Sequence, residues 1–139
     1  MTVRVFADTN LFIYAESQDQ HKAACALAII QNSPVVSSQV INETVSVLTR
    51  KHGFLLSEAH EIAESLLDLC EVVAVDANTI RKAIDLAKHY SLSHWDSLII
   101  AAALLADCQT LFSEDMQHGQ VFDKQLTVVN PFVNQGCQL

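Results

Sequence analysis

The sequence predicts a single α/β domain with a mainly parallel central sheet. Short apolar runs of strand length alternate with longer segments that have a helical period, which is the pattern of this fold class. The chain has 139 residues and half of them are hydrophobic, which suits one domain with a substantial core. No repeat, linker or low-complexity segment divides it. We expect residues 1–132 to form the domain and residues 133–139 to form a loose tail.

The first half of the chain predicts two buried strands among three helical segments. Val3–Ala7 is a run of apolar and β-branched residues that is typical of a buried parallel strand. Ser37 or Ser38 can cap a helix that ends before Gly53, because Ser accepts hydrogen bonds at helix starts and Gly favours helix ends. In order, the expected elements are strand 3–7, helical segment 11–15, helix 19–31, strand 35–36 and a helix from 37 or 38 to 52.

The second half predicts three helices and three strands. Ser57 and Asp76 are the expected caps of two amphipathic helices, whose apolar stripes include Leu67, Ile80 and Ile84. The next helix is almost wholly apolar and is expected to be buried. In order, the expected elements are helix 57–70, strand 72–75, helix 76–90, helix 94–106, strand 110–112, a polar loop 117–124 and strand 126–129.

Charge and hydropathy exclude several classes of protein. The net charge of −8 argues against a protein that coats nucleic acid, which would be basic. Two basic pairs, Arg50-Lys51 and Arg81-Lys82, fit either exposed helix faces or a local track for an RNA backbone. No apolar run reaches the roughly 18 residues of a membrane span, and no signal peptide is visible, so we expect a cytoplasmic protein. Zinc is not expected, since no Cys/His pair has ligand spacing.

Four acidic motifs stand at expected strand ends or helix starts. Asp8 ends the first strand, Asp115 follows the strand 110–112, and Glu43 and Asp96 lie in the first turns of helices. The carboxyl ends of parallel strands share one edge of a sheet, so one cavity can collect all four. Clustered carboxylates repel each other unless a divalent cation lies between them. The pattern therefore predicts a Mg²⁺ or Mn²⁺ site and metal-dependent phosphodiester chemistry.

Each carboxylate also has a purely structural interpretation. Asp8 could form an Asx-turn with the backbone of Asn10, and Glu43 could be an ordinary solvated helix residue. Asp96 fits a capping box that begins at Ser93. Asp115 could simply begin a turn of helix. The functional hypothesis depends on all four meeting at one edge.

Three passages carry a resemblance to a known family: Phe6–Asn10 (FADTN), Trp95–Ala103 (WDSLIIAAA) and Leu111–Gly119 (LFSEDMQHG). With a Glu in the intervening helix, their order resembles the PIN domain, and within it the VapC ribonuclease toxins of bacterial toxin–antitoxin systems. The resemblance extends from Val3 to about Pro131. It implies a PIN-like α/β/α sandwich and an endoribonuclease that depends on Mg²⁺ or Mn²⁺. It also implies a homodimer and a small antitoxin whose tail covers the acidic pocket.

Carried over by motif, the resemblance assigns roles to seven residues. Asp8, Glu43 and Asp96 are the first three acidic metal ligands. Asp115 is the fourth, and Glu114 beside it is a competing candidate. Asn10 and Ser113 would orient the carboxylates or the phosphate.

Other functions remain open from the sequence. A stand-alone PIN-like nuclease or a catalytically inactive PIN-like module that binds protein would share these motifs. A Mg²⁺-dependent phosphatase would want a second Asp two residues after Asp8, where this chain has Asn10. In a phosphotransfer domain, Asp76 could be the phosphoacceptor, but no acidic pair stands beside Asp8.

Overall fold

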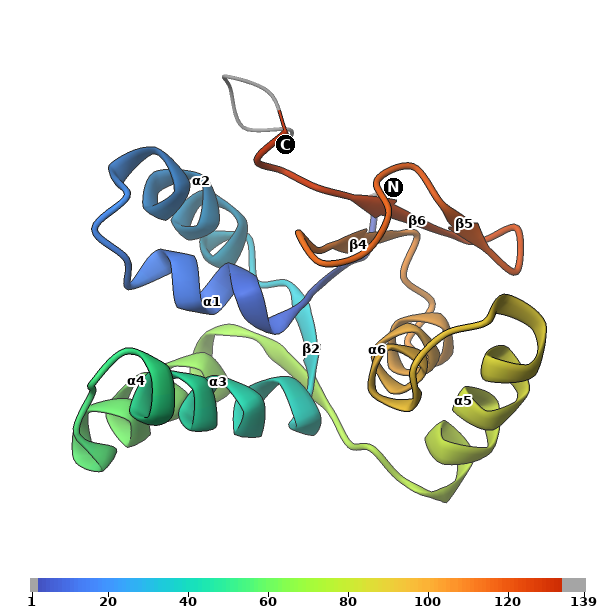
Figure 1. The fold of residues 1–139 in the computed structure, drawn as a ribbon, viewed down its shortest axis with the longest axis horizontal. Coiled ribbons are helices and arrows are strands. Elements are labelled where there is room, and N and C mark those ends of the chain that lie inside the picture. The colour runs from blue at the N-terminus through green and yellow to red at the C-terminus, as the bar shows by residue number, and fades with distance from the viewer. Residues whose placement is uncertain (1–2, 134–139) are drawn as a thin grey trace.

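Six strands form one mixed sheet in a computed structural model that describes residues 3–133. Their order across the sheet is β3-β2-β1-β4-β6-β5 (Figure 1). All neighbours pair in parallel except β5 and β6, which are antiparallel. The prediction of a mainly parallel sheet is therefore confirmed. The bounds are β1 Val5–Ala7, β2 Val35–Ser37, β3 Glu71–Val73, β4 Thr110–Phe112, β5 Val121–Phe122 and β6 Leu126–Val129.

Six helices flank the sheet within the described range. The four helices α1 to α4 lie on one side of the strands, and α5 and α6 lie on the other (Figure 1). Consecutive helices pack against each other in pairs, α1 with α2, α3 with α4, and α5 with α6. The result is a three-layer α/β/α sandwich. The bounds are α1 Thr9–Ala15, α2 Gln20–Gln31, α3 Ser38–Lys51, α4 Leu56–Leu69, α5 Ala77–Tyr90 and α6 His94–Leu105.

Most helix starts follow the predicted caps. The side chains of Ser37, Asp76 and Ser93 accept hydrogen bonds from backbone N–H groups of the first turns of α3, α5 and α6. The predicted cap Ser57 is wrong, because α4 already begins at Leu56. The cap position is Leu55, whose backbone N–H donates a 2.8 Å hydrogen bond to the Glu58 carboxylate, and Ser57 lies inside the first turn.

The polar segment 117–124 contains a short strand that the sequence did not predict. Val121 and Phe122 form β5 and pair with β6 across a tight turn. Asp123 and Lys124 in that turn have φ angles of 51° and 55°, the left-handed conformation that narrow hairpins require. Phe122 is fully buried, so one aromatic ring anchors an otherwise polar loop.

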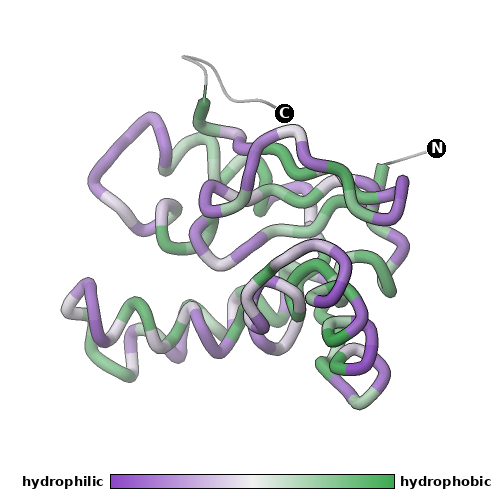
Figure 2. Tube along the Cα trace, turned by 45° about the vertical axis from the view of Figure 1, so that its right-hand side comes forward, coloured by the Kyte–Doolittle hydropathy of each residue, from purple (hydrophilic) through white to green (hydrophobic). Residues whose placement is uncertain are grey.

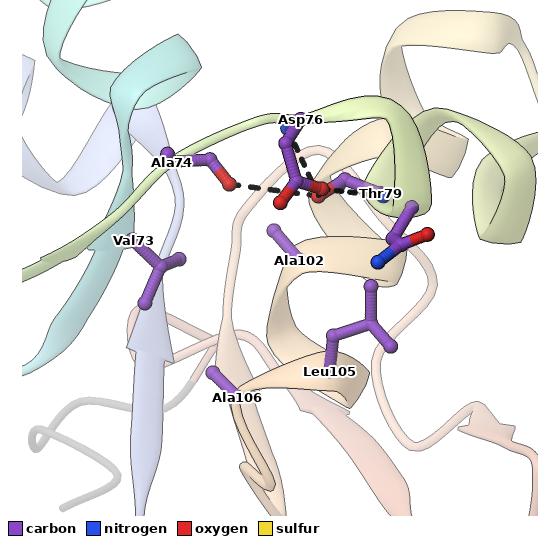
Figure 3. A pocket seen from close by; sticks show the side chains of 8 residues that line it. Val73, Ala74, Asp76, Thr79, Ala102, Leu105 and Ala106 are labelled. Carbon is purple, nitrogen blue, oxygen red and sulfur yellow. Dashed lines mark hydrogen bonds between the residues drawn. The ribbon is translucent and has the colours of Figure 1, made fainter.

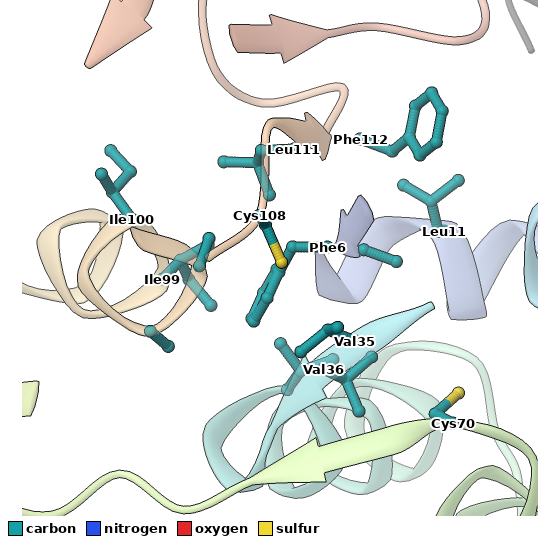
Figure 4. Packing of buried hydrophobic residues seen from close by; sticks show 14 of the residues in the cluster. Phe6, Leu11, Val35, Val36, Cys70, Ile99, Ile100, Cys108, Leu111 and Phe112 are labelled. Carbon is teal, nitrogen blue, oxygen red and sulfur yellow. The ribbon is translucent and has the colours of Figure 1, made fainter. Parts of the chain in front are cut away.

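The core lies between the sheet and the helices. Phe6 and Leu111 from the strands meet Ile99 and Ile100 of α6, and Cys70 and Cys108 fill small spaces as free thiols (Figure 4). Helix α6 is buried over Ser97–Leu104, as its composition predicts. In Figure 2 most of the coiled turns of the tube alternate between hydrophobic and hydrophilic residues, as amphipathic helices do.

The predicted apolar stripes of the outer helices are too wide. Leu67, Ile80 and Ile84 remain 42–50% exposed. Helices α4 and α5 contact the core through narrower stripes of buried residues, which are Ala59, Ala63 and Leu66 in α4 and Thr79, Ala83 and Leu86 in α5. No helix in residues 3–133 is long and apolar enough to cross a bilayer. The expected tail, residues 133–139, lies outside the described residues except for Val133.

Candidate active site at the carboxyl edge of the sheet

The strand order places a crevice between the ends of β1 and β4. The chain leaves β1 towards β2 on one side, whereas β4 continues the sheet on the other side. Ligands of open α/β sheets bind at such a switch point, outside the carboxyl ends of the strands. Because Ala7 pairs with Phe112, the next residues of the two strands, Asp8 and Ser113, are neighbours. The Ser113 hydroxyl donates a 2.9 Å hydrogen bond to Asp8 Oδ2.

Asp8 is a buried carboxylate that forms no ion pair with any cation of residues 3–133. Only 6% of the residue is exposed. Its pKa is raised to about 6, chiefly by burial and also by the charges of Asp115 and Glu43, although hydrogen bonds from the Thr9 N–H and the Ser113 hydroxyl oppose the rise. The expected Asx-turn with Asn10 is not formed. Instead Asp8 Oδ1 caps α1 by accepting a 2.7 Å hydrogen bond from the Thr9 N–H.

Asp115 lies beside Asp8 through two polar bridges. Its backbone N–H donates to the Ser113 hydroxyl at 3.2 Å, and that hydroxyl also holds Asp8. The Asn10 amide donates to Asp115 Oδ2 at 3.2 Å and accepts from the Glu114 N–H at the same distance. Asn10 and Ser113 therefore hold the 113–115 turn against the end of β1.

The Glu114 carboxylate is held by partners other than those of Asp8 and Asp115. It accepts hydrogen bonds from Lys22 Nζ at 2.9 Å and from the Tyr14 hydroxyl. Lys22 Nζ also lies 4.3 Å from the centre of the Tyr14 ring. Burial alone would raise the pKa of Glu114, but the hydrogen bonds from Tyr14 and Lys22 outweigh it and lower the pKa. Of the two neighbouring acids, Asp115 faces Asp8, and Glu114 is neutralised elsewhere.

Glu43 and Asp96 complete the group from α3 and α6. The Thr9 hydroxyl donates to Glu43 Oε2 at 3.0 Å, and Gln39 Nε2 donates to Glu43 Oε1 at 2.6 Å. The pKa of Asp96 is raised by burial and by the charges of Asp115 and Glu43. Capping of α6 is provided by the Ser93 hydroxyl, which accepts from the Asp96 N–H at 3.1 Å. The Ser93 cap at the start of α6 and the proximity of the Asp96 carboxylate to the other acids therefore coexist.

The four carboxylates have the donor chemistry of a hard cation but not a closed ligand shell. Among the side chains of residues 3–133, no three His, Cys, Asp or Glu groups are close enough to hold a metal ion by themselves. Hydroxyl and amide groups of Thr9, Asn10 and Ser113 bridge the acids. Mg²⁺ usually takes one or two carboxylates and keeps several waters, so the chemistry of these oxygen ligands suits a hydrated ion.

A hollow of about 370 Å³ opens beside Asp115. Thr9 and Asn10 line it together with Lys51 and His52, so a cation stands across from the acidic group. The second basic pair does not contribute to this hollow, since Lys82 forms a 2.6 Å ion pair with Asp123. Of the two basic pairs, which the sequence left open between exposed helix faces and a track for RNA, the Arg50-Lys51 pair contributes Lys51 to the lining of this hollow.

A separate hollow of about 230 Å³ lies beyond β3, between α5 and α6 (Figure 3). Asp76 lines it, but this carboxylate accepts hydrogen bonds from the backbone and hydroxyl of Thr79 and caps α5. Hydrogen bonding to Thr79 lowers the pKa of Asp76. Its capping role explains Asp76 without phosphotransfer chemistry.

The sequence interpretation missed the residues that join the acids. Thr9 could have been identified from the Asp8-Thr9-Asn10 motif, because its hydroxyl stands next to a carboxylate that was expected in the site. Gln39 stands four residues before Glu43, the spacing at which helix side chains meet, and this signal could have identified it. The contact of Lys22 with Glu114 joins residues 92 apart in sequence, which no local pattern indicates.

Comparison with known proteins agrees with the geometry. A chain of a toxin–antitoxin complex from Klebsiella pneumoniae superposes with a TM-score of 0.69 at 18% identity, covering 93% of this chain and 98% of that chain. The Mycobacterium tuberculosis VapC20, a sarcin–ricin loop cleaving toxin, gives 0.64 at 21% identity, over 78% of this chain and 88% of that one. DNA-bound VapBC from Salmonella typhimurium superposes with a TM-score of 0.65 at 13% identity, covering 91% of this chain and 98% of that chain.

These structures share the fold of this protein. Comparison with curated protein sequences gave no significant match. The sequence itself matches the PIN domain over residues 5–122, which span all four acidic residues and most of the described chain. The chain therefore belongs to the PIN domain family.

Proposed function

We propose that this protein is a metal-dependent endoribonuclease that serves as the toxin of a toxin–antitoxin pair in the cytoplasm. The observation that carries the proposal is the group of Asp8, Glu43, Asp96 and Asp115 at the switch point of the sheet. No Lys, Arg or His of residues 3–133 forms an ion pair with any of them. Such a concentration of uncompensated acids is expected where a cation binds.

In this proposal the four carboxylates hold Mg²⁺ or Mn²⁺. A bound ion of this kind lowers the pKa of a water molecule and offsets charge on the scissile phosphate. Thr9, Gln39 and Ser113 fix the orientation of the acids through the hydrogen bonds described above. Lys51, across the hollow from Asp115, is placed to contact a neighbouring phosphate of the substrate.

RNA is the proposed substrate, and a protein antitoxin is the proposed partner. VapC20 is described as cleaving the sarcin–ricin loop, and several solved structures with this fold are toxin–antitoxin complexes. A group of uncompensated carboxylates would accept an antitoxin Arg in charge-assisted hydrogen bonds. We also propose a homodimer, as the resemblance to VapC toxins implies.

The test is cleavage of single-stranded RNA in Mg²⁺ or Mn²⁺ by the full chain and by Asp8→Asn and Asp96→Asn. Both variants should lose activity by about 100-fold or more, because even groups that only orient metal ligands are typically worth 10–100-fold. Asp68→Asn, an exposed acid on α4, is the matched control and should cleave at the normal rate. Cleavage that survives both substitutions would refute the assignment.

A protein-binding module without catalysis is the second candidate. It is favoured by the absence of a closed three-ligand group among residues 3–133. Mn²⁺ titration separates the two functions. The nuclease should show a saturable Mn²⁺ site that Asp8→Asn removes, and an inactive module should show none.

A further inference from the structure

Trp95 is an exposed aromatic residue next to the acidic group. It directly precedes Asp96 in α6, and 64% of the residue is exposed. Its ring makes one edge-on contact, with His94 at 5.5 Å between ring centres. A single exposed apolar side chain is common on protein surfaces, so the case for a binding site depends on what surrounds this ring. The proposed chemistry of Asp96 does not use the ring.

The ring borders a hollow that adjoins the acidic group. This hollow measures about 410 Å³ and is lined by Trp95, Glu43 and six further residues. Glu43 belongs both to this hollow and to the acidic group, so the two spaces share a wall. The hollow that contains Lys51 is lined by Thr9, whose hydroxyl donates a hydrogen bond to Glu43, so both hollows adjoin the acidic group. A chain that crosses the acidic group can therefore reach both.

The lining combines an apolar base with amides and hydroxyls. Leu98 and Val75 supply apolar surface, and Leu98 is buried. Polar side chains complete the lining, from Ser38, Gln39, Asn42 and Ser46 of α3. Gln39 Nε2 donates to the Trp95 carbonyl at 3.3 Å and to Glu43 Oε1, whereas its buried Oε1 has no partner among residues 3–133. Gln39 thus fixes the Trp95 backbone relative to Glu43.

An aromatic face beside amide groups is the arrangement that recognises unpaired bases. Proteins bind single-stranded RNA by stacking its bases on aromatic rings and by hydrogen-bonding the base edges. The lining carries no Lys or Arg, so a phosphate has no partner there and a neutral base fits better. This reasoning rests on the proposed nuclease function, which would place the scissile phosphate at the adjoining carboxylates.

We propose that Trp95 stacks on a nucleobase of single-stranded RNA next to the cleaved bond, with Asn42 and the other polar groups of α3 facing the base edge. The hollow therefore contributes to substrate affinity and to the choice of base at that position. Lys51, in the hollow beside Asp115, contacts the backbone and contributes no base preference.

Trp95 is the single tryptophan of the chain, so its fluorescence reports on this site alone. The probe is a short 2′-O-methyl oligoribonucleotide of mixed sequence, titrated into the full chain in Ca²⁺. We expect saturable quenching of the emission. With the same oligonucleotide carrying a fluorescent label, anisotropy should show about 10-fold to 100-fold weaker binding for Trp95→Ala and near-normal binding for Trp95→Phe. Leu56→Ala, also exposed but in α4, should bind normally.

The outcomes separate this proposal from the proposed function. If the full chain cleaves RNA but Trp95→Ala binds and cleaves normally, the stacking site is refuted and the nuclease stands. If the 2′-O-methyl oligonucleotide quenches Trp95 emission but the full chain cleaves no unmodified RNA in Mg²⁺ or Mn²⁺, the proposed nuclease function fails and the base site survives. If Trp95 emission changes with protein concentration in the absence of RNA, and RNA does not change it, this surface contacts another copy of the chain and the proposal is overturned.

Discussion

Glu114 and Asp115 are neighbours in sequence and belong to two regions with opposite electrostatics. Glu114 is neutralised by Lys22 and Tyr14, and its pKa is lowered. Asp115 belongs to a group of acids that form no ion pair within the described part of the chain, and in this group Asp8 and Asp96 have raised pKa values. One acid therefore stabilises the fold through its partners. The other adds to a local repulsion that the fold tolerates, and such repulsion is typical of functional sites.

The largest difference between the two regions should appear in RNA cleavage. Asp115→Asn removes one of the clustered charges and should lower the rate by about 100-fold or more. Glu114→Gln keeps an acceptor for Tyr14 and should retain most of the activity. The measurement is the initial rate of cleavage in Mg²⁺ at fixed RNA concentration. Equal losses in both variants would mean that the region around Lys22 takes part in catalysis.

A second contrast concerns the stability of the metal-free protein. The pKa of Asp8 is about 6, above its ordinary value of 3.8, so the folded state binds this proton more tightly than the unfolded state does. The stability that comes from protonated Asp8 is therefore complete below about pH 4 and is lost as the pH rises to about 6. The difference between the two values corresponds to about 3 kcal/mol.

Asp8→Asn should accordingly stabilise the metal-free protein at pH 7 by about 1–3 kcal/mol and flatten this pH dependence. Urea unfolding in a chelator at several pH values measures the effect. Asp68→Asn on the surface of α4 is the control and should leave the curve unchanged. A metal-free Asp8→Asn protein that is clearly less stable than the original would contradict the idea of a strained acidic group.

The smallest expected effect lies in the compensated region. Lys22→Met keeps apolar contact with the Tyr14 and Phe132 rings but leaves Glu114 without its cation. We expect a loss of about 1–2 kcal/mol in the free energy of unfolding, since hydrogen bonds to charged groups contribute about that much. Urea unfolding provides the value, and Lys88→Met on α5 is the control. If Lys22→Met were more stable than the original protein, the Lys22–Glu114 ion pair would not be stabilising the fold, and this account of the region would be wrong.

The sequence predicted the layers of the fold because each depends on local signals. Apolar strand runs, the caps Ser37, Asp76 and Ser93, and the apolar helix α6 all appear where their residues indicate. Strand β5 was missed because two residues in a polar loop carry no periodicity, and its pairing with β6 depends on a turn with left-handed residues. Ile80 and Ile84 are exposed although they belong to the apolar stripe of α5. The pattern of apolar residues in a helix therefore does not reveal how much of that face a neighbouring helix covers.

For the site, the meeting of Asp8 and Asp115 could be predicted, and the partners of the acids could not. The predicted place of Glu43 in a first helical turn is wrong, because α3 begins at Ser38 and Glu43 lies in its second turn. Parallel strand ends must share an edge, which brings Asp8 and Asp115 together by topology. The choice between Asp115 and Glu114 depends on Lys22, which reaches Glu114 from a distant helix. Contacts of that kind depend on how α1 and α2 pack, and one sequence does not encode them as a local pattern.

Mn²⁺ binding tests the central claim most directly, because it does not require a known RNA target. Calorimetric titration of the full chain, Asp8→Asn and Glu114→Gln should give a saturable site in the first, none in the second and an almost unchanged site in the third. The same result in all three proteins, or no saturable site in the full chain, would contradict the claim that the acidic edge of the sheet is a metal centre.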